Sequence, residues 1–106
     1  MPDVCSYATF WDRYLRAHAR ASTRALHYCG TSLALVALLL SFRDWRFIIG
    51  VPVIGYGFAW TAHFLVEHNR PETFGRPLWS LYSDLRMLGL FLTGRLEPHL
   101  RRVGLR

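Results

Sequence analysis

The sequence predicts an all-α integral membrane protein of four helices with a central transmembrane hairpin. Two apolar runs predict the hairpin. No charged side chain interrupts Leu26 to Phe42, and His63 is the only histidine or charged residue between Phe47 and Val66. Each run approaches the roughly 20 helical residues that a bilayer's hydrocarbon core requires. At 106 residues we expect one membrane domain over residues 1–106, with no room for a second catalytic domain.

The charge distribution favours a membrane partner. The net charge of +6 comes from arginine alone, because the sequence contains no lysine. A nucleic-acid binder would carry a basic stripe on a soluble surface, whereas these arginines lie between and beside apolar segments. We therefore expect no nucleic-acid partner. Arginines around the first helix and in the Asn69–Arg76 loop outnumber the two in the hairpin turn, so that side is predicted to be cytoplasmic.

The first helix is predicted over about Ser6 to Arg20 and is amphipathic. Its apolar and aromatic residues recur at steps of three and four: Tyr7, Phe10, Trp11, Tyr14, Leu15 and His18. Tryptophan and tyrosine favour the depth of lipid headgroups, and arginine pairs with lipid phosphates. We therefore expect this helix to lie in or near the membrane interface. Trp11 of this helix, and Trp45 and Trp79 elsewhere in the chain, are interpreted as interfacial anchors.

The second and third helices form the predicted hairpin. Ser22 and Thr23 suit the N-cap of a helix that runs to about Ser41. The charged segment Arg43–Arg46 makes the turn, and the third helix runs from about Phe47 to His68. The proline and glycines of the third helix would be costly in water, but in a membrane they permit close helix packing and kinks.

A fourth helix is predicted from about Leu78 to Gly94, with Pro77 at its first position. It contains Asp84 and Arg86, which a full membrane span would have to bury or pair. A half-embedded or interior-facing helix fits the sequence equally well. The remaining tail is basic.

Hairpin geometry predicts that two histidines lie at the same depth. His27 and His63 are nearly equidistant in sequence from a turn centred between Asp44 and Trp45, and both helices rise equally per residue. In one continuous helix, His18 and His27 would be separated by about 900° of rotation and would lie on opposite faces. A bend at Ser22 allows them to converge.

Carboxylates accompany these histidines. Glu67 follows His63 by one helical turn, on a stripe that also holds Tyr56 and Trp60. Asp84 lies on one face of the fourth helix, together with Ser80 and Met87. Imidazoles near a carboxylate suit Fe(II), Zn(II) or Mn(II), although the histidines of a membrane protein also serve as interhelical hydrogen-bonding groups.

Two further histidines carry simpler interpretations. His68 ends the third helix, where it suits the helix dipole. His99, in the basic tail, is interpreted as a solvated residue.

The ordered series of short motifs resembles the family of domain-of-unknown-function 962, the Mpo-like family. The matching segments are Phe10-Trp11-x-x-Tyr14-Leu15-x-x-His18, Arg24-x-Leu26-His27-x-x-Gly30-Thr31, Gly55-Tyr56-Gly57-x-Ala59-Trp60-x-x-His63-Phe64-x-x-Glu67, Asn69-Arg70-Pro71-x-Thr73-Phe74, and Pro77-Leu78-Trp79-Ser80-Leu81-x-x-Asp84-x-Arg86-Met87. Together they cover about residues 7 to 90.

The resemblance implies a membrane-bound, Fe(II)-dependent dioxygenase of fatty-acid α-oxidation, which shortens 2-hydroxy fatty acids by one carbon with O2. It assigns the metal to His18, His27 and His63, with Glu67 and Asp84 as supporting catalytic candidates that either bind the metal or orient a ligating imidazole. Arg24 and Arg70 are candidates for neutralising the substrate's carboxylate. The metal site is expected toward the cytoplasmic side.

Two other functions remain compatible with the sequence. One is a small non-enzymatic scaffold or lipid-binding protein whose histidines only form hydrogen bonds. The other is a zinc-dependent lipid hydrolase. Metal content separates the first from an enzyme, and a requirement for O2 separates the second from a dioxygenase.

Overall fold

The computed structural model describes residues 6–70 and 76–105, and these ranges are helical without a strand. Five α-helices and one short π-helix follow one another along the chain: α1 (Tyr7–Ala17), α2 (Ala21–Leu40), α3 (Phe47–Thr61), η1 (Ala62–Glu67), α4 (Pro77–Leu92) and α5 (Leu96–Arg102). The all-α prediction is confirmed. The count differs from the four predicted helices because the basic tail forms α5.

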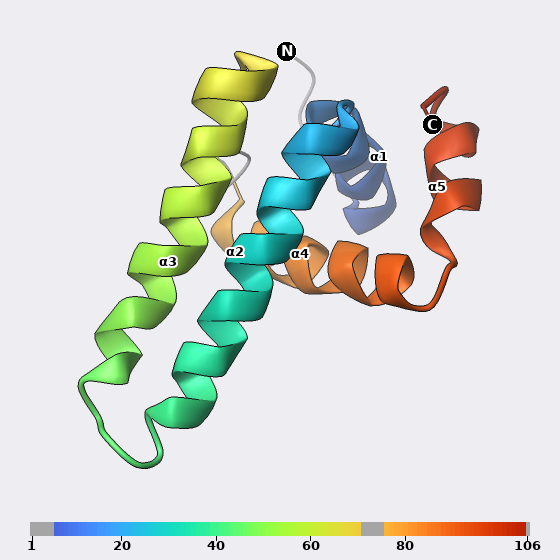
Figure 1. The fold of residues 1–106 in the computed structure, drawn as a ribbon. Helices are drawn as coiled ribbons and strands as arrows, with labels where there is room; N and C mark the ends of the chain where they lie inside the picture. The colour runs from blue at the N-terminus through green and yellow to red at the C-terminus, as the bar shows by residue number, and fades with distance from the viewer. Residues whose placement is uncertain (1–5, 71–75, 106) are drawn as a thin grey trace.

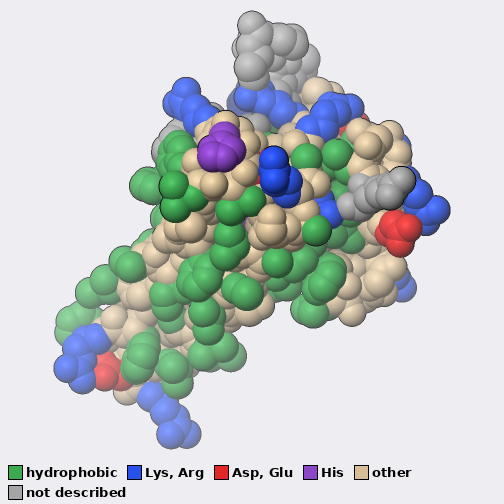
Figure 2. All heavy atoms as spheres, turned by 45° about the horizontal axis from the view of Figure 1, so that its top comes forward, with side chains coloured by type: hydrophobic (Ala, Val, Ile, Leu, Met, Phe, Trp, Pro, Cys, Tyr) green, Lys and Arg blue, Asp and Glu red, His purple; other side chains and the backbone are tan. Residues whose placement is uncertain are grey.

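The central hairpin consists of α2 packed antiparallel on α3 and its continuation η1 (Figure 1). Both α2 and the segment Phe47–Glu67 are long and apolar enough to cross a membrane. The turn between them carries an ion pair, in which Nη2 of Arg46 lies 2.7 Å from Oδ2 of Asp44. Figure 2 shows basic side chains at both ends of the hairpin and hydrophobic side chains along the shaft between them. This distribution fits a bilayer's apolar core between two polar interfaces.

Helices α2 and α3 approach closely at Gly30. A Cβ atom added to this glycine would lie 2.5 Å from Cβ of Phe58, a distance that real Cβ contacts do not show. Gly30 therefore lets the two backbones approach each other, as small residues commonly do at interfaces between membrane helices. Gly57, on α3, is different, because an added Cβ there would meet nothing within 4 Å.

These two glycines give a matched prediction for stability. We expect Gly30→Ala to push α2 away from α3 and to destabilise the protein by about 1–3 kcal/mol, as overpacked sites do. Gly57→Ala should be neutral or slightly stabilising, because alanine favours a helix. Thermal unfolding of both variants in the same detergent measures the contrast. Equal melting temperatures for the two variants would contradict the close packing at Gly30.

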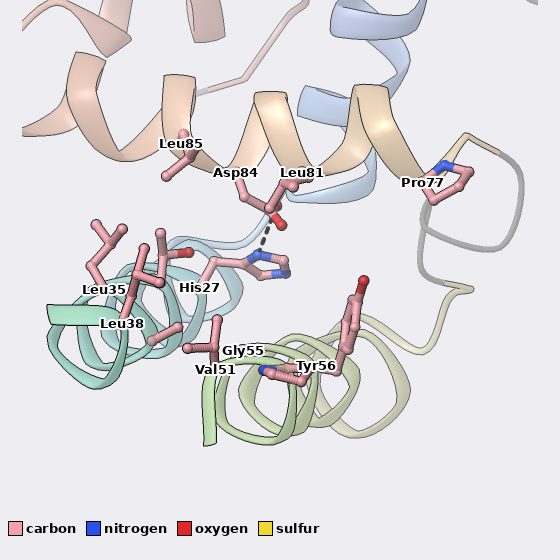
Figure 3. Close-up of a pocket in the computed structure, with 13 residues that line it drawn as sticks. His27, Leu35, Leu38, Val51, Gly55, Tyr56, Pro77, Leu81, Asp84 and Leu85 are labelled. Carbon is pink, nitrogen blue, oxygen red and sulfur yellow. Dashed lines mark ion pairs between the residues drawn. The ribbon is translucent and has the colours of Figure 1, made fainter. Parts of the chain in front are cut away.

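A second core joins α1, α4 and α5. Its buried members are Phe10, Trp11, Tyr14, Leu15, Met87, Leu96 and Leu100. The helix α4 runs across the hairpin rather than along it (Figures 1 and 3). An ion pair also ties α5 to α1, with Nη1 of Arg102 2.6 Å from Oδ1 of Asp12. These elements form a helical layer beside one end of the hairpin.

This core corrects the interpretation of Trp11 as an interfacial anchor. Trp11 is only 2% exposed, so it is a core residue and not a membrane anchor. Trp79 is half-buried and packs against the same core, whereas Trp45, at the hairpin turn, is 70% exposed. The periodicity of α1 identified its apolar face correctly, but periodicity does not reveal what covers a face. Here α4 and α5 cover it.

The junction between α1 and α2 also differs from the prediction. Helix α2 begins at Ala21 with Arg20 as its N-cap, so Ser22 and Thr23 lie inside the first turn. Oε1 of Glu67 accepts a hydrogen bond from the backbone N–H of Arg20 at 2.5 Å. An acceptor distant in sequence therefore replaces the predicted local cap.

Candidate metal centre

Three histidines converge where α1 ends and the hairpin helices are farthest from their turn. Nε2 of His27 lies 3.0 Å from Nε2 of His18 and 3.2 Å from Nε2 of His63. All three side chains are buried: His18 is 0% exposed, His27 is 4% exposed and His63 is 2% exposed. Each can offer one nitrogen to a metal ion, and these atoms all lie within 4.8 Å of one another.

The opposite nitrogen of each ring is held by an acceptor. Nδ1 of His18 lies 2.7 Å from the backbone carbonyl of Tyr14, and Nδ1 of His63 lies 2.6 Å from Oδ1 of Asn69. Nδ1 of His27 faces Oδ1 of Asp84 at 3.4 Å (Figure 3). A carbonyl or carboxylate oxygen only accepts, so each ring carries its proton on Nδ1. All three Nε2 lone pairs then face one another.

This arrangement fits a metal ion. Three lone pairs directed at one point repel one another unless a cation or a proton lies between them, and neutral imidazole is a common ligand of transition metals. Imidazole nitrogens bind such ions at about 2.0–2.1 Å, which puts neighbouring ligands about 3 Å apart. Acceptors behind ligating histidines fix their ring orientation and raise their basicity. The cluster therefore has both the ligands and the supporting shell of a metal site.

The electrostatics of the α1 residues agree with this assignment. Burial lowers the pKa of His18 well below its ordinary value, and the neighbouring His27 and His63 lower it further. His18 is therefore neutral and available as a ligand at pH 7. Burial, together with the Asp84 carboxylate, raises the pKa of Tyr14 well above its usual value. Tyr14 thus keeps its proton and donates a hydrogen bond to Oδ1 of Asp84.

The π-helix η1 determines which side chains of this segment reach the centre. A π-helical turn contains more residues than an α-helical turn, so it shifts the faces of the residues that follow. His63 enters the cluster, whereas Glu67 reaches Arg20. His68 ends the segment in the left-handed conformation with φ of 60°. The backbone N–H of Asn69 then donates to the carbonyl of His63 at 2.8 Å.

The predicted convergence of the three histidines is confirmed, and Asp84 contacts one of them. Glu67 accepts a hydrogen bond from the backbone N–H of Arg20 at the start of α2, because the π-helix changes the helix face that regular α-helix spacing predicted for it. Nη1 of Arg24 donates to the carbonyls of His18 and Ala19, at 2.7 and 2.9 Å, so its buried guanidinium joins α1 to α2. Arg70 is exposed.

Asn69 is the supporting residue that sequence reasoning missed. Its Nδ2 donates to the carbonyl of Ala17 at 2.9 Å, which turns its Oδ1 toward His63. One side chain therefore links the end of η1 to the end of α1. Asn69 directly follows the third predicted helix and belongs to one of the matched motifs, and this position could have indicated its role.

The interpretation of His99 as a solvated residue is wrong. Its Nδ1 accepts a hydrogen bond from Nε1 of Trp11 at 3.1 Å, and the two rings meet edge to face. Partial burial lowers the pKa of His99, and the charges of Arg86 and Arg102 lower it further. His68 is exposed, so it is the better histidine for a control substitution.

A cavity of about 360 Å³ reaches the cluster from between α2, α3 and α4. Figure 3 shows His27 and Asp84 at its wall. The lining residues are His27, Thr31, Ala34, Leu35, Leu38, Val51, Pro52, Gly55, Tyr56, Pro77, Leu81, Asp84 and Leu85. The surface is thus mostly apolar, and the polar side chains of His27 and Asp84 border it.

Comparison with protein families gives one match over residues 4–96, to the family described as 2-hydroxy-palmitic acid dioxygenase Mpo1-like. The chain belongs to this family. The match includes all three clustered histidines, Asn69 and Asp84. Comparisons with curated proteins and with solved structures gave no match. The Mpo1-like assignment agrees with the resemblance inferred from the motifs, and the name of the family concerns a hydroxylated fatty acid.

Proposed function

We propose that this Mpo1-like protein is a membrane-embedded, Fe(II)-dependent dioxygenase that shortens a 2-hydroxy fatty acid by one carbon. His18, His27 and His63 are the proposed ligands. The observation that carries the proposal is the convergence of three Nε2 atoms whose Nδ1 partners are all acceptors. The description of the family supports the reaction and the substrate class.

Iron held by His18, His27 and His63 would supply the oxygen chemistry of the reaction. The chain's own groups position the ligands around it. Asp84 faces Nδ1 of His27, Tyr14 donates to Asp84, and Asn69 holds the ring of His63. Burial of all three rings keeps bulk water away from the centre.

The substrate's carboxylate needs a positive counterpart. The guanidinium of Arg24 is 6% exposed and bonds the carbonyl of His18, so it places a permanent charge beside the cluster. This charge favours an acid over a neutral lipid. Arg70 is exposed and is proposed to attract the carboxylate at the rim.

The proposed reaction balances without a further reductant: R–CH(OH)–COOH + O2 gives R–COOH + CO2 + H2O. The bond between the carboxyl carbon and the α-carbon breaks. The α-carbon is oxidised to the new carboxyl, the old carboxyl leaves as CO2, and O2 takes up the four electrons. One O2 is therefore consumed for each shortened acid.

We also propose that the hairpin spans the bilayer. His27 and His63 lie at the end of the hairpin away from its turn, beside the α1 layer, which is rich in arginine. The excess of arginine there favours a cytoplasmic position for the metal centre. A substrate held at this depth keeps its carboxylate near the interface and its acyl tail among apolar side chains.

Reconstituted protein loaded with Fe(II) tests the function. Given a long-chain 2-hydroxy fatty acid, it should form the acid one carbon shorter and consume one O2 per product. The matching acid without the 2-hydroxyl should consume none. Undiminished turnover under strict anaerobiosis would exclude a dioxygenase, and no turnover at full iron loading would leave a binding protein.

A further inference from the structure

The cavity beside the histidine cluster has one polar end and a long apolar remainder. His27 and Asp84 border the polar end, whereas the far end lies between Leu38 of α2 and Val51 of α3 (Figure 3). These last two residues are equally distant in sequence from the hairpin turn, so they lie at the same level. The cavity therefore follows the axis of the hairpin away from the metal centre. An amphiphile with a polar head and one apolar tail matches this polarity.

The length of the cavity suits a single acyl chain. From His27 to Leu38 the helix rises about 16 Å, at about 1.5 Å per residue. A C–C bond of about 1.5 Å at a tetrahedral angle gives about 1.3 Å per methylene, so about 12 methylenes span that distance when extended. The volume of about 360 Å³ is small for a helix of a partner protein.

The side of the cavity opens between α2 and α4 toward the surface that we assign to the bilayer. Leu35, Leu81 and Leu85 line the cavity and remain 39%, 57% and 42% exposed. Exposed leucines at this depth contact hydrocarbon, so an acyl chain can enter sideways without crossing water.

Two small residues lie opposite each other about two-thirds of the way along the cavity from its polar end. A Cβ atom added to Gly55 would lie 3.8 Å from Cβ of Ala34, an ordinary contact. Both residues line the cavity, and Ala34 lies about 10 Å from His27 along α2. Larger side chains at this level would divide the cavity into two parts.

We propose that this cavity holds the acyl chain of the substrate and that Ala34 and Gly55 determine the longest chain it accepts. The inference rests on the proposed function, because it takes the head group to lie at the histidine cluster. The carboxylate and 2-hydroxyl lie beside His27, and the methyl end lies near Leu38 and Val51.

Photo-crosslinking in lipid vesicles tests the position of the chain without using turnover. The probe is a 2-hydroxy fatty acid of about 16 carbons, a length that fills the cavity, with a diazirine near its methyl end. We expect labelling around Leu38 and Val51 that excess unlabelled 2-hydroxy acid suppresses. Labelling that no competitor suppresses, spread over the outward faces of the hairpin, would show ordinary bilayer contact and overturn the proposal.

Substitutions in the same helix provide the matched control. Gly55→Leu should reduce the competed labelling at least about tenfold, because a leucine side chain overfills the space opposite Ala34. Gly57→Leu should not, because Gly57 is exposed and does not line the cavity. Ala34→Leu blocks the same level from the opposite helix and should repeat the effect of Gly55→Leu. Equal labelling of all three variants would contradict the assignment.

Turnover separates this inference from the proposed function. With Gly55→Leu, the longest accepted acid should shorten by about five carbons, because about 6 Å of the cavity is lost. If excess 2-hydroxy acid suppresses the labelling but the protein shows no turnover, the acyl-chain site stands and the dioxygenase proposal is excluded. If the wild type and Gly55→Leu turn over acids with the same chain-length dependence, the dioxygenase proposal stands and the acyl-chain site is excluded.

Discussion

Replacing His63 with alanine is expected to abolish oxygen-dependent turnover and most metal binding. His63 contributes one of the three converging Nε2 atoms and is 2% exposed. Loss of a supporting residue behind a ligand costs about 10–100-fold in metal affinity or activity, so loss of the ligand itself should cost at least about 100-fold. The same result is expected for His27→Ala. Oxygen consumption with a 2-hydroxy fatty acid measures the effect.

His68→Asn is the matched control for this experiment. His68 is exposed, lies five positions after His63, and adopts a left-handed conformation that asparagine tolerates. Turnover should remain near the wild-type value. If His63→Ala and His68→Asn retained equal activity while folded, the converging histidines would not be the active centre. Adventitious iron would tolerate both substitutions.

Replacing Asp84 with asparagine is expected to lower metal affinity by about 10–100-fold. Asp84 faces Nδ1 of His27 at 3.4 Å and accepts a hydrogen bond from Tyr14. Asparagine keeps the shape of the side chain, but it removes the negative charge that faces Nδ1 of His27. Titration of apo protein with Fe(II) under anaerobic conditions measures the affinity directly.

Glu97→Gln controls for the loss of one acidic charge. Glu97 is 69% exposed and pairs with Arg101 on α5, so its removal should leave the affinity unchanged. A similarly small effect of Asp84→Asn would mean that Asp84 is only a structural partner of Tyr14. A distinct spectrum of the bound metal in Asp84→Asn, with the fold intact, would support its action through His27.

The sequence was sufficient to predict the hairpin and the convergence of its histidines. An apolar run indicates the length of a helix that is able to span a membrane. Because both helices rise equally per residue from one turn, His27 and His63 lie at one level. The break before α2 similarly allowed His18 to reach His27. These inferences needed only helix geometry and the distribution of charge along the chain.

The supporting contacts were harder to predict because they depend on local deviations from regular helices. Regular spacing put Glu67 behind His63, but the π-helix η1 directed Glu67 to Arg20 and left that role to Asn69. The local pattern of apolar and polar residues does not predict a π-helical turn. Likewise, the amphipathic face of α1 was recognised, whereas its cover by α5 depended on tertiary contacts such as Trp11 with His99.

The metal content of protein purified without oxygen tests the central claim most directly. We predict about one iron per chain in the wild type, and little metal in a variant with alanine at His18, His27 and His63. Circular dichroism should show that this variant keeps its helices, because the hairpin packs independently through contacts such as Gly30 with Phe58. Wild-type protein that binds no transition metal after incubation with Fe(II), or a triple variant that keeps its full metal content, would contradict the claim.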